Sequence, residues 1–280
     1  MSLTRCSARS TRSSTSSTPF HESKVPPGAE FHVIRRISHQ GEADLYTGRS
    51  QKIPMVGASQ KEERFPVHHL VIGMRWSLFD EQASTFASSN LREEYMFAAR
   101  RACMEKYNEL LLKGDDDAGF TGLLNSEIPK VATGVSYVSA TTADDIIADL
   151  HAKANFASER SKNRFMPDTV AMAPSEHNLF TTKKRSTTTD QTIMQAFRQD
   201  NAYISEVQIW PELAGAGPNG ENLMLFYKRN NRRAIDRVEV KPFSVLPLER
   251  QMFDRIIPAY SSHGGLVTRD PLYNLLAYVQ

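Results

Sequence analysis

The chain has few cysteines, with only Cys6 and Cys103 in 280 residues, and no Cys-x-x-Cys pair. Cys6 lies in a Ser- and Thr-rich segment and Cys103 in a helical pattern, so we expect free thiols and synthesis in a reducing cytoplasm. No uninterrupted apolar run approaches the ~18 residues of a membrane-spanning helix, so we expect no membrane partner. The N-terminal arginines precede no apolar segment, so we expect no secretory signal.

Motifs for metal binding, cofactor binding and catalysis are also scarce. The sequence has no His-Glu-x-x-His, Gly-x-Ser-x-Gly or Walker motif, and adjacent His68 and His69 would point to opposite faces of a strand. Gly215 to Gly220 spells Gly-x-Gly-x-x-Gly, but a strand-like run follows where a dinucleotide site needs a helix. We therefore interpret this segment as a hairpin loop and expect neither metal nor cofactor.

Two remaining clusters could suggest an enzyme. Asp115 to Asp117 could bind a divalent cation, but the alternating ligand spacing of a calcium loop is absent, which favours a solvated acidic turn. Ser262 and His263 have no identifiable acidic partner and are better explained as a turn between strands. An enzyme built on either cluster stays a distant alternative.

Acidic residues are missing from residues 1–18, which are rich in Ser and Thr and carry Arg5, Arg9 and Arg12. Such a segment cannot bury enough surface to offset its ordering entropy, so we expect a flexible arm. Its positive charge makes it a candidate to face DNA, because phosphate attraction needs only charge and flexibility. The exposed run Lys183-Lys184-Arg185 is more typical of a solvated loop.

What is present is ordinary globular composition: 40% hydrophobic residues, 24% charged residues and a net charge of +2. Strand-like runs at residues 31–34 and 67–72 flank a polar segment from Gly48 to Arg64, which predicts an extended, projecting hairpin. The polar residues of this hairpin are Arg49, Lys52, Lys61, Glu62 and Arg64, and the family resemblance given below implies that they contact neighbouring subunits.

The strongest helical pattern begins after Asn90, which with Glu93 resembles a capping box, and ends at Gly114. Its ~23 residues would form a rod of roughly 35 Å. Further helices are predicted from Thr142 to Ser158, over 175–180 and over 192–198, and a loop is predicted at 183–189. A buried strand is predicted at 168–173, and further strands are predicted at 204–210, 223–227, 238–240, 256–257 and 265–268. Because strands and helices do not alternate regularly, the pattern indicates an α+β fold.

Several sequence features occur in the same order as in one known family. They are Val25-Pro26-Pro27-Gly28-Ala29-Glu30, the long helix, Gly122-Leu123-Leu124-Asn125, Pro167-Asp168-Thr169, Leu246-Pro247-Leu248-Glu249-Arg250 and Gly264-Gly265-Leu266-Val267 with Pro271. In this order the chain resembles a subgroup of the HK97-like major capsid proteins of tailed bacteriophages, over roughly residues 25–280.

The resemblance implies a domain organisation. Residues 1–29 would be the N-terminal arm, 30–79 the extended E-loop region, and 80–135 the P-domain with its spine helix. Residues 136–245 would form most of the A-domain, and 246–280 C-terminal strands that complete the core.

The resemblance also implies a function: a non-enzymatic structural protein of the virion capsid. It would assemble with itself as hexamers and pentamers of an icosahedral shell around double-stranded DNA, with scaffold, portal and decoration proteins as further partners. The alternative with the same fold is an encapsulin-like nanocompartment shell that carries protein cargo.

Overall fold

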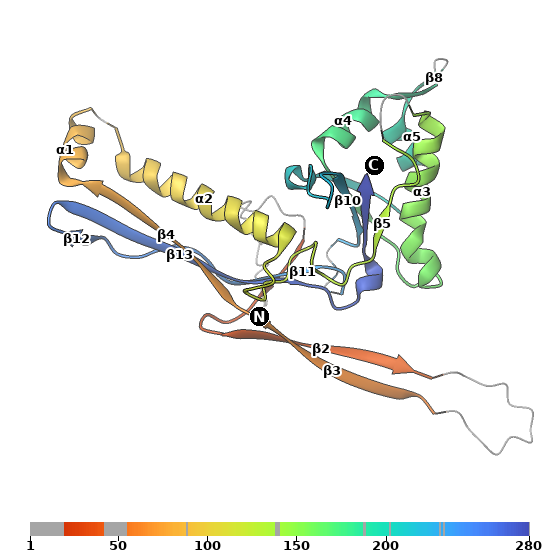
Figure 1. Cartoon of the computed structure of the whole chain (residues 1–280), viewed down its shortest axis with the longest axis horizontal. Helices are drawn as coiled ribbons and strands as arrows, with labels where there is room; N and C mark the ends of the chain where they lie inside the picture. Colours follow the sequence, from red (N-terminus) through yellow and green to blue (C-terminus); the bar gives the residue numbers. More distant parts are fainter. Residues whose placement is uncertain are drawn as a thin grey trace, which may run out of the picture.

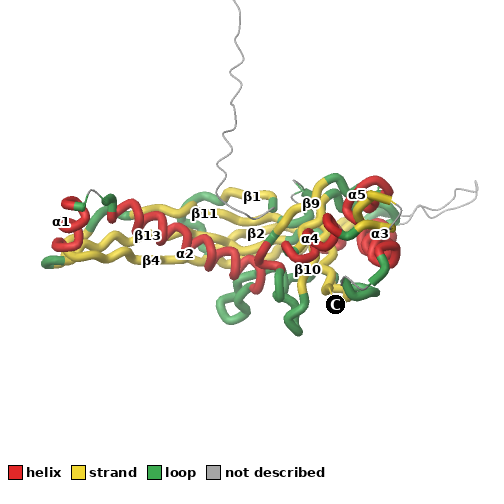
Figure 2. The backbone as a smooth tube through the Cα atoms, turned by 90° about the horizontal axis from the view of Figure 1, so that it is seen from above, coloured by secondary structure: helices red, strands yellow, loops and turns green. Residues whose placement is uncertain are grey.

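The computed structural model describes residues 20–41, 55–87, 89–137, 141–186, 189–201, 203–229, 231 and 233–279. They form an elongated, flat molecule with two sheets, a long helix and a projecting hairpin (Figures 1 and 2). The N-terminal arginines Arg5, Arg9 and Arg12 and the hairpin residues Arg49 and Lys52 lie outside the described residues.

The first sheet forms the long body of the molecule. Its strand order is β1-β11-β13-β12, with β4 paired to β13. The strands are β1 (His21–Lys24), β4 (His68–Ser77), β11 (Asp236–Val245), β12 (Glu249–Gln251) and β13 (Asp254–Val267). The helix α2 (Leu91–Lys113) lies along this sheet (Figure 1). Ala99 of α2 packs there against Trp76 and Ile257.

The second sheet has the order β5-β14-β10-β6-β9. Its strands are β5 (Lys130–Ala132), β6 (Thr169–Met172), β9 (Glu206–Ile209), β10 (Asn222–Tyr227) and β14 (Leu275–Val279). The helices α3 (Ala143–Arg160), α4 (Pro174–Thr182) and α5 (Ile193–Asp200) gather at this end, beside the small hairpin of β7 (Lys184–Ser186) and β8 (Thr189–Thr192) (Figure 1). Short 3₁₀ helices span Pro211–Leu213 (η1) and Pro271–Tyr273 (η2).

Both faces of the second sheet are buried, because successive strand residues point to opposite sides. On β10, Met224 and Phe226 belong to the core formed with α3 and α5, whereas Leu223 and Leu225 belong to the core that contains the end of α2. The two cores therefore share one sheet, which joins the two halves of the molecule.

The long helix matches its sequence prediction in length and at its C-terminus. It spans 23 residues, and Gly114 follows it with φ +75°. The predicted side-chain cap is wrong, because the Asn90 side chain makes no capping hydrogen bond. The predicted start of α3 is confirmed, and the Thr142 hydroxyl caps the helix by accepting a hydrogen bond from the Asp145 N–H.

The projecting hairpin pairs different segments from those predicted. β2 (Phe31–Gln40) is antiparallel to β3 (Gly57–Pro66), which is itself part of the charged segment, whereas the 67–72 run belongs to β4 in the first sheet. On β3 the residues from Gly57 to Glu62 and Arg64 are exposed, and only Glu63, Phe65 and Pro66 are half-buried, so its sequence shows no alternation of buried and exposed residues.

Other predictions were also wrong at particular elements. The predicted loop at 183–189 contains β7 and the start of β8; the strands at 256–257 and 265–268 are one strand, β13; and α1 (Leu78–Phe86), β12 and β14 were not predicted. The turn at Gly215–Gly220 leads into β10, but it is not a hairpin loop, because β9 and β10 are separated by β6. Within the expected flexible arm, β1 pairs in parallel with β11.

Candidate subunit interface

The hairpin of β2 and β3 points away from the body (Figure 1) and has two unlike faces. On β2, Ile34 is 3% exposed and packs against Val238 and Val267 of the body. The alternate residues Phe31, Val33 and Ile37 are 54%, 47% and 53% exposed. An isolated two-stranded hairpin is at best marginally stable in water, so an apolar outer face on such a hairpin suits contact with another molecule.

The polar hairpin residues predicted from sequence divide between these two faces. Arg64 and Glu62 lie opposite Val33 and Arg35 on the exposed face, and the Arg35 Nε lies 2.8 Å from the Glu62 Oε1. Lys61 is exposed and its ammonium lies 3.2 Å from the Glu63 carboxylate. The outer face therefore combines an apolar row with charges that can meet a partner.

Arg36 fastens the root of the hairpin to the body. Its guanidinium lies 3.1 Å from the Glu63 carboxylate and 2.6 Å from the Glu127 carboxylate, and it donates to the Thr268 carbonyl oxygen at 2.8 Å. Hydrogen bonding to Arg36 lowers the pKa of Glu127. One side chain thus joins β3, the segment after α2 and the end of β13.

The segment after α2, singled out in the sequence, is a compact junction. Asp115 and Phe120 pair as an isolated bridge, and the Asp115 carboxylate accepts the Ala118 N–H at 3.0 Å. The Asn125 amide donates to the Asp116 carboxylate at 2.9 Å, and its oxygen accepts the Gly122 N–H at 2.6 Å. These carboxylates act as turn acceptors, and the described residues contain no group of ligands arranged to hold a metal ion.

Close backbone approach explains two glycines of this junction. A Cβ on Gly122 would lie 2.3 Å from the Gly114 nitrogen, and Gly265, with φ +77°, would place a Cβ 2.8 Å from the Thr121 carbonyl oxygen. The neighbouring Leu266 N–H donates to that same Thr121 oxygen at 2.8 Å. The turn therefore holds the end of the spine helix against β13.

Ser262 and His263 lie within β13, so their predicted turn is wrong. The Ser262 hydroxyl lies 2.7 Å from the His69 Nδ1, whereas the His263 ring stacks on Tyr107 with centroids 3.7 Å apart. Burial lowers the pKa of His263 to about 3. The two side chains contact different partners, and nothing in this geometry pairs them as nucleophile and base.

A charged cluster joins β1 to the body. Arg237 lies 2.9 Å from the Glu22 carboxylate and 3.6 Å from that of Glu239, and these three residues line a cavity of about 660 Å³ with Tyr107 and His263. Burial, and then hydrogen bonding to Glu22, raises the pKa of Glu239 to about 7. Phe20 packs edge-on against Trp210, with ring centroids 5.3 Å apart. The start of the described chain is thus integrated into the core.

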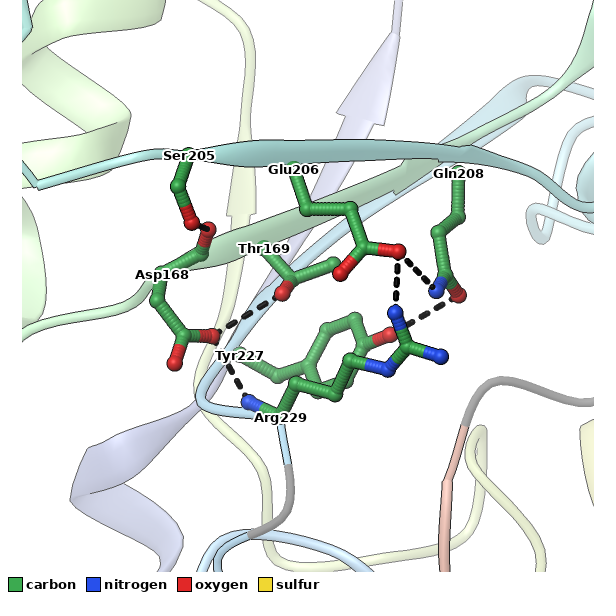
Figure 3. A network of polar contacts seen from close by, with 7 residues as sticks. All are labelled: Asp168, Thr169, Ser205, Glu206, Gln208, Tyr227 and Arg229. Atoms are coloured by element: carbon green, nitrogen blue, oxygen red, sulfur yellow. Dashed lines mark hydrogen bonds and ion pairs between the residues drawn. The ribbon is translucent and has the colours of Figure 1, made fainter.

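A polar network ties β6, β9 and β10 of the second sheet together (Figure 3). Asp168 accepts the Arg229 N–H at 2.7 Å, the Arg229 guanidinium pairs with Glu206, and the Tyr227 hydroxyl donates to the Gln208 oxygen at 3.1 Å. Hydrogen bonds from Gln208 and Arg229 lower the pKa of Glu206. The network is satisfied internally and therefore acts as a structural clasp.

A second exposed apolar cluster lies at the far tip of the body. The rings of Phe79 and Phe253 stack with centroids 5.8 Å apart while remaining 63% exposed, and Met252 is 97% exposed. Phe86 of α1 is 95% exposed. The sequence analysis did not predict this apolar cluster. The feature that could have indicated it is the apolar pair Met252-Phe253, which stands between polar residues in the sequence.

The remaining cysteine prediction can be checked at one residue: Cys103 is free and buried in α2. Burial raises the pKa of its thiol. No helix within the described ranges is long and apolar enough to cross a membrane.

Comparison with solved structures shows where this combination of elements occurs. The capsid of Myoviridae phage XM1 superimposes with a TM-score of 0.80 and 16% identity, over 94% of this chain and 90% of that one. A structure of Mycobacterium phage Adephagia gives 0.65 and 10%, over 95% and 89%. A virus-like particle from Pyrococcus furiosus gives 0.61 and 12%, over 92% and 90%. No curated protein sequence matches significantly.

A spine helix on one sheet, a second sheet with its helices and a projecting hairpin define a capsid subunit of the HK97-like fold. The family model described as "Major capsid protein" matches residues 41–275. The chain therefore belongs to the major capsid protein family, whose role is structural, in the shell of the virion.

Proposed function

We propose that this chain assembles with copies of itself into hexamers and pentamers of an icosahedral shell that encloses phage double-stranded DNA. The observation that carries the proposal is the exposed apolar row Phe31, Val33 and Ile37 on a hairpin that projects beyond the body. On a monomer these side chains remain exposed to water. When the hairpin lies on a neighbouring subunit, burial of this apolar surface contributes a free energy of ~25 cal/mol per Å².

The domain organisation belongs to the same proposal. The boundaries at residues 29, 79, 135 and 245 stay predictions. The pairing of β4 and β11 with β13, under α2, supports counting both strands with the P-domain. We assign the sheet that contains β10 to the A-domain.

The predicted contact residues stay proposals. Lys61, Glu62 and Arg64 would meet a neighbouring subunit, together with Arg49 and Lys52 of the same hairpin. Arg5, Arg9 and Arg12 would face packaged DNA through non-specific phosphate attraction. Scaffold, portal and decoration proteins are the proposed further partners, and synthesis takes place in the cytoplasm of a bacterial host.

An encapsulin-like shell with protein cargo is the second candidate, supported by the likeness to the Pyrococcus furiosus virus-like particle at TM-score 0.61. The higher score of 0.80 for the phage XM1 capsid favours the phage head. The contents of purified particles, nucleic acid or enzyme, distinguish the two. We propose that the chain has no enzymatic activity, since its Ser, His and Asp clusters serve packing and turns.

Adjacent hairpin residues give a matched test of assembly. We expect Val33→Ser, on the outer face, to leave the stability of the unassembled chain within about 0.5 kcal/mol but to reduce shells seen by negative-stain electron microscopy. We expect Ile34→Ser, on the buried face, to lower the unfolding free energy by about 2–5 kcal/mol. Normal shells from a Val33→Ser chain that also carries Ile37→Ser would contradict the proposed contact.

A further inference from the structure

Three segments that are distant in the sequence meet at one end of the strands of the second sheet, before β6 and β14 and after β10. The turn after α3 reaches η2 through Phe165 and Tyr273, whose ring centroids are 3.8 Å apart. The connection from β10 to β11 reaches the same place, since the Asp270 N–H donates to the Arg233 carbonyl oxygen at 3.0 Å. Figure 1 shows the end of α3 and η2 at the same margin of the domain.

This margin is rich in cations, and we call it the basic edge. Its members are Arg160, Lys162, Arg164, Lys228, Arg233 and Arg269. Arg160, Lys162, Arg164 and Arg233 are exposed, and within the described part of the chain none of these four forms an ion pair. The acids within four residues of these cations in the chain are Glu159, Asp168, Asp236 and Asp270. Asp236 is already bonded to His21 and Ser23, and Arg229 is paired with Glu206. The basic edge therefore carries an excess of positive charge.

The local backbone presents part of this charge around a hollow. A depression of about 510 Å³ is lined by Arg160, Ser161, Lys162, Arg164, Phe165 and Leu272. Lys162 and Asn163 have φ values of +53° and +62°, which turn the chain sharply, and the Ser161 hydroxyl accepts the Phe165 N–H at 2.9 Å to close that turn. Three cationic side chains thus surround one concavity.

The basic edge lacks the features of a protein contact. Such interfaces centre on apolar or aromatic anchors with a polar rim. The large apolar side chains exposed on the described surface lie elsewhere: on the hairpin, the tip, the spine helix, β4 and β9, at the end of β11, and at Tyr203. The apolar side chains that line the hollow are Phe165 and Leu272, and both are half-buried. Exposed arginines and lysines around so small an apolar area match a polyphosphate backbone, which is bound through charge and carries no sequence information.

We propose that the basic edge is a contact surface for the phosphates of packaged double-stranded DNA, separate from the N-terminal arm. This inference rests on the proposed function, because it assigns the nucleic acid of the shell to a particular surface. It expects binding without sequence preference and with strong salt dependence.

The test measures binding of the unassembled full chain to a short DNA duplex by fluorescence anisotropy at several salt concentrations. The variant is K162Q/R164Q/R233Q, which removes three exposed cations; Lys162→Gly is a useful addition because glycine suits its positive φ. The control is R92Q/R198Q, which removes two exposed cations on α2 and α5. The arm is present in every chain and contributes equally.

We expect the slope of log K against log salt to become shallower by about 2.7 in the triple variant, at about 0.9 per lost phosphate contact, and to stay unchanged in the control. An unchanged slope in the triple variant, or an unmodified chain that does not bind the duplex, would overturn the inference. Loss of shell assembly with normal DNA binding would instead identify the edge as a contact between copies. Failure of the unmodified chain to assemble bears on the proposed function alone, because DNA binding is measured before assembly.

Discussion

Two adjacent arginines on β2 should contribute very differently to the hairpin. The Arg36 side chain is 21% exposed and contacts two carboxylates and a carbonyl oxygen. The Arg35 side chain is 68% exposed, and within the described ranges its one ion pair is with Glu62. Arg36→Gln and Arg35→Gln remove the same charge from neighbouring positions. The pair therefore separates the role of the inward face from that of the outward face.

The expected magnitudes follow from exposure. Hydrogen bonds to charged groups contribute about 1.5–3 kcal/mol when shielded, but Glu127 is 65% exposed, so its share is below about 1 kcal/mol. Arg36→Gln should cost about 2–3 kcal/mol. Arg35→Gln should cost about 0.2–1 kcal/mol, as solvent-exposed pairs do.

Hydrogen exchange of the β2 and β3 amides in the unassembled chain measures the difference directly, because local opening of the hairpin controls it. Arg36→Gln should speed exchange there by about 30- to 150-fold, since each 1.4 kcal/mol is a factor of ten. The second sheet should be unaffected. Equal acceleration by the two variants, or acceleration spread over both sheets, would refute the assignment of Arg36 as the anchor.

Three further predictions concern the body of the subunit. Gly122→Ala should lower the unfolding free energy by more than about 3 kcal/mol, since its Cβ would meet backbone at 2.3 Å, whereas Gly73→Ala, with nothing within 4 Å, should change it by less than about 1; chemical denaturation of both variants measures this. Because the folded pKa of Glu239, about 7, lies above its unfolded value, the protonated carboxyl contributes stability at low pH that is lost as pH rises from about 4.5 through 7. Glu239→Gln should reduce this decline in unfolding free energy by up to about 1–2 kcal/mol. The measurement is the difference in unfolding free energy between the variant and the parent at each pH, because the opposite pH trend that His263 causes below about pH 6.5 is present in both chains and cancels. Tyr107→Phe removes a buried hydroxyl that has no hydrogen-bond partner among the described residues, and it should raise stability by up to about 1 kcal/mol, measured by thermal denaturation. A fall of that size would show that the hydroxyl is hydrogen-bonded.

The elements that could be predicted from the sequence are those whose signals lie within a few neighbouring residues. The spacing of apolar residues and the glycine at the C-terminus were sufficient to predict α2. Thr142, followed by acidic residues in the first turn, was sufficient to predict α3, because capping and amphipathicity depend on residues a few positions apart. The Asn90 cap failed because a suitable side chain does not guarantee the geometry that joins it to the N3 amide. α1 was missed because none of its residues is buried, so it shows no inward-facing pattern.

The candidate interface was harder to predict than the fold. The sequence pointed to a projecting hairpin but assigned its second strand to 67–72, since charged β3 resembles a loop until its partner β2 is known. The tip cluster of Phe79 and Phe253 and the basic edge each unite segments far apart in the chain. No window of sequence contains such a surface, and only the pairing of strands brings it together.

The amino-acid sequence by itself determined the class of this protein: an α+β chain with a long spine helix, a charged hairpin and an ordered set of turns that resembles the major capsid family. The tertiary structure decided which strands pair, that His21–Lys24 joins the body, and which hairpin residues face outward. The physical reason is that helix ends and turns depend on neighbouring residues, whereas register, burial and the exposed faces depend on contacts between residues tens to hundreds of positions apart.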